Sequence, residues 1–218
     1  MLKFLCFLCF ILFLTSCSNI DASRIAPGYA EAFKVFDKLI FGYEDLGIDR
    51  QVIDKIPYAS SLVRIGNGPQ GLAILESKKD ATESWVSSDQ VYLIIRHGKI
   101  IRSSGLPNNL THTLMPSIEE DFLKKQNTPS FYYLSYDKPL LRNLKVEVKV
   151  KIIGQRELII LGEKKKVTLY EEELENREIR WKRINKYWID DDDFVWKSEQ
   201  YISPKLPKIV IEVTKKPS

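Results

Sequence analysis

The chain has 218 residues, of which 44% are hydrophobic, and its 33 Lys and Arg residues nearly balance its 29 Asp and Glu residues. This hydrophobic content argues against a disordered chain. The net charge of +4 does not indicate a nucleic-acid-binding protein, in which basic residues gather on one face, and the chain is long enough for one domain with its own hydrophobic core.

The N-terminus has the pattern of an export signal. Lys3 supplies a positive charge, and every side chain from 4 to 14 is Phe, Leu, Ile or Cys, which matches a short basic segment followed by an apolar one. Thr15 begins a polar stretch, so the apolar run is shorter than the about 20 residues of a transmembrane helix. We therefore predict that residues 1–16 form a signal peptide that is removed.

Residues 14–17, with the sequence Leu-Thr-Ser-Cys, resemble the lipobox of bacterial lipoproteins. A diacylglycerol thioether can be built only on a thiol, so Cys17 is predicted to become the lipid-bearing N-terminus. In the sorting rule that this class implies, Asp after the Cys retains a lipoprotein in the inner membrane, and Ser18 therefore indicates the outer membrane. Cys6 and Cys9 leave with the signal, so no disulfide is expected.

A tether and a helix are predicted next. Residues 17–26 are short and polar, which suits a lipidated tether. An amphipathic helix is expected over 27–42, because Pro27 suits a first turn and apolar residues then recur at spacings of three and four. Its charged residues are of mixed sign, which favours packing on a sheet over lying in a membrane. A second, shorter helix is expected over 49–55.

From residue 56 the sequence changes to short runs with β texture, separated by turn residues. His97-Gly98 has the two-residue spacing of a tight hairpin, with Gly98 at positive φ, and the acidic run 190–193 links two further strands. Residues 144–151 alternate apolar and charged side chains, as in a strand with one buried face. The candidate strands are 60–65, 72–76, 83–87, 91–96, 99–103, 131–135, 144–153, 158–161, 166–172, 179–184, 187–189, 194–201 and 209–213.

Strand texture lapses between 105 and 129, where a capping box at 117–120 predicts a short helix that runs to Lys125. No internal repeat or domain boundary is evident after the tether. The predicted fold is mainly β: an antiparallel sandwich or barrel-like sheet in a single periplasmic domain over 27–218, preceded by the N-terminal amphipathic helix.

Several blocks that span most of the mature chain form a distinctive pattern, namely 56–66, Leu75, 85–89, 96–106, 109–110, 185–190, 195–200, 203–204 and 209–216. These blocks resemble the YjbF/GfcB family of lipoproteins. The chain departs from the family pattern in three places: Lys99 and Ser103 stand where Arg and Thr are expected, and the turn at 190–193 lacks an expected Gly.

The resemblance implies an outer-membrane lipoprotein encoded beside genes for capsule or exopolysaccharide production, without a catalytic motif. The partners it implies are the outer membrane through the lipid, an outer-membrane β-barrel, other periplasmic secretion proteins and polysaccharide, but not nucleic acid. We therefore expect a non-enzymatic accessory or scaffold that is anchored to the outer membrane and faces the periplasm. A polysaccharide-binding module is the alternative, and a hydrolase is the third hypothesis.

Residues that could carry chemistry give little support for catalysis. His97 lies at a predicted hairpin tip and His112 in an irregular segment, and two lone His residues do not make a zinc site. Carboxylates at 171–173 would point to alternate faces of a strand rather than face each other across a sugar bond. The run 190–193 is interpreted as a solvated turn, with a calcium site as the alternative. No metal or cofactor is expected.

Aromatic residues are the remaining candidates, because sugar rings stack on Trp and Tyr side chains. All four Trp residues, including Trp181, fall in predicted strands. Trp85, Trp188 and Trp196 are candidates for glycan or partner contact, and core packing is the simpler interpretation of each.

Overall fold

The computed structural model describes residues 47–115 and 130–217. The chain divides into two compact units, Met1–Gly42 and Tyr43–Ser218, and all described residues belong to the second. The signal peptide, Cys17, Ser18, the tether and the helices expected over 27–42 and 117–125 lie outside the described residues. These features, and the start of the domain at residue 27, therefore stay predictions.

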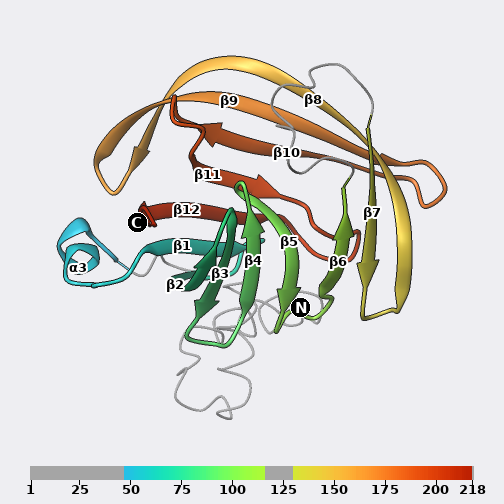
Figure 1. The fold of residues 1–218 in the computed structure, drawn as a ribbon, viewed down its shortest axis with the longest axis horizontal. Helices are drawn as coiled ribbons and strands as arrows, with labels where there is room; N and C mark the ends of the chain where they lie inside the picture. Colours follow the sequence, from blue (N-terminus) through green and yellow to red (C-terminus); the bar gives the residue numbers. More distant parts are fainter. Residues whose placement is uncertain (1–46, 116–129, 218) are drawn as a thin grey trace, which may run out of the picture. The chain divides into compact units, whose positions relative to one another are not determined.

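The described part of the second unit forms one antiparallel sheet of twelve strands (Figure 1). The order across the sheet is β5-β4-β3-β2-β1-β12-β11-β10-β9-β8-β7-β6. The elements are α3 (Arg50–Asp54), β1 (Ser60–Ile65), β2 (Gln70–Lys79), β3 (Thr82–Ser87), β4 (Tyr92–Arg96), β5 (Lys99–Ser104), β6 (Leu110–Leu114), β7 (Ser130–Tyr136), β8 (Leu141–Ile160), β9 (Glu163–Asn176), β10 (Trp181–Ile189), β11 (Val195–Gln200) and β12 (Ile209–Lys215).

The sheet consists of two runs of consecutive hairpins, β1 to β5 and β6 to β12, joined where β1 pairs with β12. Strands β5 and β6 are therefore its two ends. These ends meet through side chains, since Thr113 Oγ1 donates to the carbonyl of Ile101 at 2.9 Å and Leu110 N donates to Ser103 Oγ at 3.0 Å. The sheet is therefore nearly closed and barrel-like, because its two end strands contact each other through side-chain hydrogen bonds rather than through a continuous ladder of backbone hydrogen bonds.

The hairpin predicted at His97-Gly98 is confirmed. Arg96 pairs with Lys99 across the turn, and the φ angles of His97 and Gly98 are +48° and +73°, as a type I′ turn requires. The alternation of residues 144–151 is also confirmed, because Leu144, Val146, Val148 and Val150 are buried on one face of β8.

A bulge in β8 changes which face its side chains occupy. Val150 lies opposite Glu172, but the register shifts between Ile152 and Gly154, and Gly154 then lies opposite Leu169. Even-numbered residues of β8 beyond the bulge therefore share a face with odd-numbered residues of β9. The far part of this hairpin forms a small separate core, which consists of Leu158, Ile160 and Val167 packed with Leu161, Trp188 and Trp196.

The mainly antiparallel β prediction is confirmed, with local differences. Two pairs of predicted strands are continuous: 144–153 and 158–161 contribute to β8, which ends at Ile160, and 179–184 and 187–189 contribute to β10. Strand β6 was not predicted, because its Thr-His-Thr centre is polar and its apolar Leu114 is exposed. The second helix is confirmed as α3, where Asp49 accepts a hydrogen bond from Val52 N at 2.9 Å.

Candidate functional site

A cluster of polar side chains lies inside the barrel, between β5, β7, β9, β10 and β11. Glu172 on β9 is 1% exposed and Lys99 on β5 is 7% exposed, and among the described residues no other charged side chains are buried. The two form an ion pair. Because an unpaired buried charge is very costly, each of these groups depends on the other.

Both oxygens of the Glu172 carboxylate have two donors each. Oε1 accepts from Lys99 Nζ and from Tyr132 Oη, the latter at 2.7 Å. Oε2 accepts from Asn185 Nδ2 at 3.0 Å and from Tyr187 Oη at 3.1 Å. A carboxylate has about four acceptor positions, so the surrounding side chains occupy all of them.

The ionisation of the cluster follows from this geometry. Burial acts to raise the pKa of Glu172, but the Lys99 charge and the hydrogen bonds from Lys99, Tyr132 and Asn185 outweigh it, so this pKa is lowered. Burial lowers the pKa of Lys99 against the opposing effect of Glu172. Burial and the nearby carboxylate raise the pKa values of Tyr132 and Tyr187 well above the usual value of tyrosine. Both phenols therefore stay neutral donors.

Gln200 connects this cluster to the end strand β5. Its Oε1 accepts from Ile100 N at 3.0 Å, and its Nε2 donates to the carbonyl of Gly98 at 2.9 Å and to Ser198 Oγ at 2.8 Å. Tyr187 Oη lies 3.4 Å from the same Oε1. Strand β5 is an end of the sheet, so within the described residues its outer edge has no ladder of backbone hydrogen bonds. The Gln200 side chain instead satisfies the N–H of Ile100 and the carbonyl of Gly98.

The space beside the cluster is small. A cavity of about 30 Å³ is lined by Lys99, Tyr132 and Glu172. Sites for small-molecule ligands are typically about 300–1,000 Å³, whereas a single water needs roughly 10–15 Å³. A buried pair of titratable groups is a usual sign of a catalytic site, but this one has neither a substrate-sized cavity nor a vacant acceptor.

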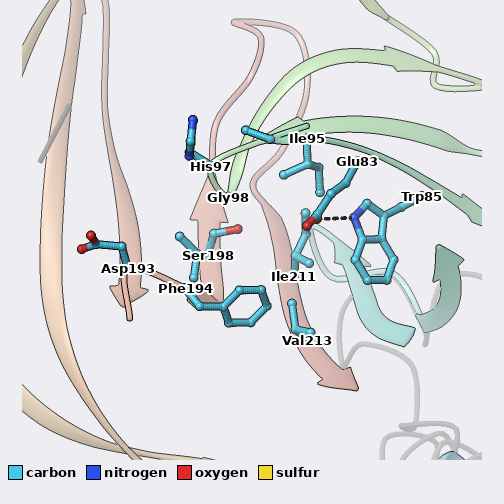
Figure 2. A pocket seen from close by; sticks show the side chains of 12 residues that line it. Glu83, Trp85, Ile95, His97, Gly98, Asp193, Phe194, Ser198, Ile211 and Val213 are labelled. Carbon is cyan, nitrogen blue, oxygen red and sulfur yellow. Dashed lines mark hydrogen bonds between the residues drawn. The ribbon is translucent and has the colours of Figure 1, made fainter. Parts of the chain in front are cut away.

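A larger cavity of about 140 Å³ lies near the β4–β5 and β10–β11 turns (Figure 2). Trp85, on one side of it, donates from Nε1 to Glu83 Oε2 at 2.9 Å. His97 and Asp193 lie at the rim and point in different directions in Figure 2. This cavity therefore does not combine the two titratable groups into an acid–base pair.

The structure does not bring the three candidate Trp residues together. Trp85 is 2% exposed and belongs to the large core. Trp188 and Trp196 are partly buried and pack on the small core under the β8–β9 hairpin. Trp196 is also held by Lys165, whose Nζ lies 3.6 Å from the ring centroid. All three rings therefore contribute to packing within the chain.

The acidic run forms a turn organised by Asp190. Its Oδ1 accepts from the backbone N–H groups of Asp192 and Phe194 at 3.0 and 2.9 Å, and its Oδ2 accepts from Trp196 Nε1 at 2.7 Å. Within the described ranges, no three His, Cys, Asp or Glu residues gather as metal ligands. His97 and His112 are exposed, on a turn and on β6.

Sequence reasoning missed the buried cluster. It placed Glu171, Glu172 and Glu173 on alternate faces, which is confirmed, since Glu171 and Glu173 pair with Lys186 and Lys182 outside the barrel. It did not recognise that Glu172 is buried. The available signal was the alternation of β9, where Glu172 shares a face with Leu174.

Residues 33–214 match the family described as group 4 capsule polysaccharide lipoprotein GfcB, YjbF. The chain belongs to the YjbF family. The YjbF resemblance noted in the sequence is therefore confirmed, and with it the class of lipoprotein. No catalytic family is indicated. Among the described residues, no helix combines the length and apolar character that crossing a membrane requires.

Similar proteins agree with this assignment. An uncharacterized lipoprotein YjbF from Escherichia coli K12 is 25% identical over 171 residues, which cover 75% of this chain and 78% of the relative. An uncharacterized lipoprotein GfcB from the same strain is 24% identical over 98 residues, 45% of this chain and 42% of the relative. The crystal structure of the hypothetical lipoprotein YmcC from E. coli K12 has a TM-score of 0.70 and 16% identity, with 89% of this chain and 98% of that one covered, and this likeness shows the fold.

Proposed function

We propose that the protein is a non-enzymatic accessory of capsule or exopolysaccharide secretion, anchored by lipid to the outer membrane and facing the periplasm. Membership of a family described as capsule polysaccharide lipoproteins supports the link to polysaccharide. In this proposal it acts by contact with an outer-membrane β-barrel and other periplasmic secretion proteins.

The non-enzymatic part of the proposal rests on the Glu172 carboxylate, because all of its hydrogen-bond acceptor positions are occupied. A general acid or base must be within hydrogen-bond reach of the substrate, yet the four acceptor positions of this carboxylate are taken by Lys99, Tyr132, Asn185 and Tyr187. Asp190 likewise uses both oxygens within its turn. These contacts support a structural role for the two carboxylates and count against the hydrolase hypothesis.

The lipid anchor is central to an accessory role. Cys17 would carry the acyl chains, and several chains give stable membrane attachment where one gives marginal binding. Anchoring raises the concentration of the domain near membrane partners without changing any contact. Ser18 supports outer-membrane sorting, so Ser18→Asp should move the protein to inner-membrane fractions on a density gradient.

The decisive experiment compares cell-surface polysaccharide in the unmodified strain with that in the deletion, Cys17→Ala, Asp190→Asn and Glu172→Gln strains. Deletion of the gene and Cys17→Ala should both reduce it strongly, and Cys17→Ala should leave an unacylated precursor that takes up no labelled palmitate. Asp190→Asn should leave export close to normal as long as the protein accumulates, because both Asp190 carboxylate oxygens are bound within the turn. Detergent extracts should yield an outer-membrane β-barrel together with the lipidated protein.

Two results would decide against the proposal. Normal export in the deletion strain would remove any role in secretion. If Asp190→Asn or Glu172→Gln abolished export while the folded, anchored protein still accumulated, the hydrolase hypothesis would replace the accessory role.

A further inference from the structure

A groove of about 400 Å³ lies at the end of the sheet where β7 turns into β8 and β9 turns into β10, both on the right of Figure 1. Its volume falls within the roughly 300–1,000 Å³ of small-molecule sites. It is more than ten times the volume of the cavity beside Glu172. The groove is lined by parts of the chain far apart in sequence, among them Tyr136, Leu141, Trp181 and Lys205.

The charged residues that line the groove are all basic. Arg180 precedes β10, Arg183 lies on β10 and Lys205 follows β11, and all three are exposed. Within residues 47–115 and 130–217, no carboxylate lies within ion-pair distance of any of the three. Other cations of β10 differ, because Lys182 and Lys186 pair with glutamates of β9. Among the described residues, the groove therefore concentrates positive charge that no carboxylate pairs.

The floor of the groove is aromatic. The Tyr136 hydroxyl donates to the carbonyl of Ile202 at 3.0 Å, which fixes that ring. Trp181 is 4% exposed, and its indole N–H is a buried donor without an acceptor among the described residues. Buried donors without a partner are rare in folded proteins. Exposed Ile179 and Leu141 add apolar surface beside the cations.

We propose that this groove binds an acidic segment of polysaccharide. Guanidinium groups match carboxylates in planar, paired hydrogen bonds, so Arg180 and Arg183 would recognise uronic-acid carboxylates. The apolar faces of sugar rings would lie on exposed Ile179 and Leu141. The choice of a saccharide rests on the proposed function, whereas the need for an anion rests on the charge of the groove alone. Direct binding of polysaccharide goes beyond the proposed accessory role, which acts through contacts with other proteins.

The test is calorimetric titration of the full lipidated protein in detergent with oligogalacturonate, and with neutral malto-oligosaccharide of equal length. We expect saturable binding of the acidic oligomer and at least about tenfold weaker binding of the neutral one. Arg180→Ala and Arg183→Ala should each reduce affinity about tenfold, since a hydrogen bond to a charged group is worth that much. Affinity should also fall as salt is added.

Lys182→Ala is the matched control, because it removes the same charge from the same strand but from a side chain paired with Glu173 outside the groove. Equal loss in this variant, equal binding of neutral and acidic oligomers, or no binding would each overturn the proposal. Arg180- and Arg183-dependent binding to anionic phospholipid vesicles, without oligogalacturonate binding, would assign the groove to a membrane surface instead. Export in the deletion strain is measured independently, so failure here leaves the accessory role standing.

Discussion

Lys99 and Glu172, 73 positions apart in the sequence, form an ion pair in the interior of the nearly closed sheet. Lys99 begins β5, an end strand with a ladder to β4 alone, and Glu172 lies in the middle of β9. Lys99 Nζ also lies 4.4 Å from the centroid of the Tyr132 ring. The pair thus attaches an end of the sheet to strands on the far side of the barrel.

Glu172→Gln should destabilise the protein by about 3–5 kcal/mol, because Lys99 would remain buried without its counter-charge. The free energy of unfolding in urea measures this cost. Glu173→Gln is the matched control on the same strand and should cost much less, since its partner Lys182 is exposed and exposed ion pairs contribute little to stability.

A double variant separates lost charge pairing from lost packing. Lys99→Met with Glu172→Gln removes both charges, so it should cost less than the sum of the two single changes. Strict additivity of the three unfolding free energies would contradict a coupled buried pair.

The sequence predicted the antiparallel sheet well because period-2 alternation and turn chemistry are local signals. Residues 144–151 and His97-Gly98 each carry such a signal, and both predictions are confirmed. The alternation of β9 places Glu172 on the buried face, but its pairing with Lys99 depends on the arrangement of distant strands, which no local pattern contains. Lys99 and Glu172 look like ordinary surface charges until the barrel brings β5 and β9 to the same interior.

The candidate Trp residues illustrate the same limit. Trp85 and Trp188 both lie in predicted strands. Trp85 nevertheless belongs to the large core, whereas Trp188 packs on a small core made by a hairpin with a bulge at Gly154. The sequence did not single out Trp181 as a contact residue. Arg180 and Arg183 flank it in the chain, but Tyr136, Leu141 and Lys205, which complete the groove, come from distant segments.

Stability should fall in acid, partly through Glu172. Its pKa is lower in the folded protein than in the unfolded chain, where it is about 4.3. The unfolded state therefore binds more protons as the pH falls, and the stabilisation that is present above about pH 4.3 is lost as the pH passes through the folded pKa. Urea midpoints measured from pH 7 downward should decline most steeply below about pH 4.

The Lys99→Met, Glu172→Gln double variant tests the assignment to this residue. It should show a shallower acid decline than the unmodified protein, because the buried carboxylate is gone. An identical decline would place the acid sensitivity in partly exposed carboxylates with lowered pKa values, such as Asp137 and Glu173.

Gly98 should be intolerant of any side chain. A Cβ added there would lie 2.3 Å from Cγ2 of Val195, and its φ is +73°. Gly98→Ala should therefore combine a conformational cost of about 1–2 kcal/mol with a steric cost of about 1–3 kcal/mol. Denaturant unfolding measures the sum.

Gly162 supplies the matched control. It occupies the second position of the β8–β9 turn at φ +82°, after Leu161 at +47°, and a Cβ there would meet nothing within 4 Å. Gly162→Ala should show the conformational cost alone. Adding Val195→Ala to Gly98→Ala should recover part of the steric cost, and equal losses in the two glycine variants would refute the close contact.

Asp193 should gain from replacement by glycine. The family resemblance leads us to expect a Gly in this turn, and Asp193 has a φ of +60°, a conformation that glycine adopts without steric cost. The turn itself is held by Asp190, whose contacts do not involve the Asp193 side chain. Asp193→Gly should therefore raise the free energy of unfolding by up to about 1 kcal/mol.

Asp191→Gly, at a neighbouring exposed position without positive φ, should instead lower the free energy of unfolding by a similar amount, because glycine there only adds freedom to the unfolded chain. Urea unfolding of both variants decides the matter, and a loss of stability in Asp193→Gly would mean that its carboxylate contributes more than its backbone conformation costs.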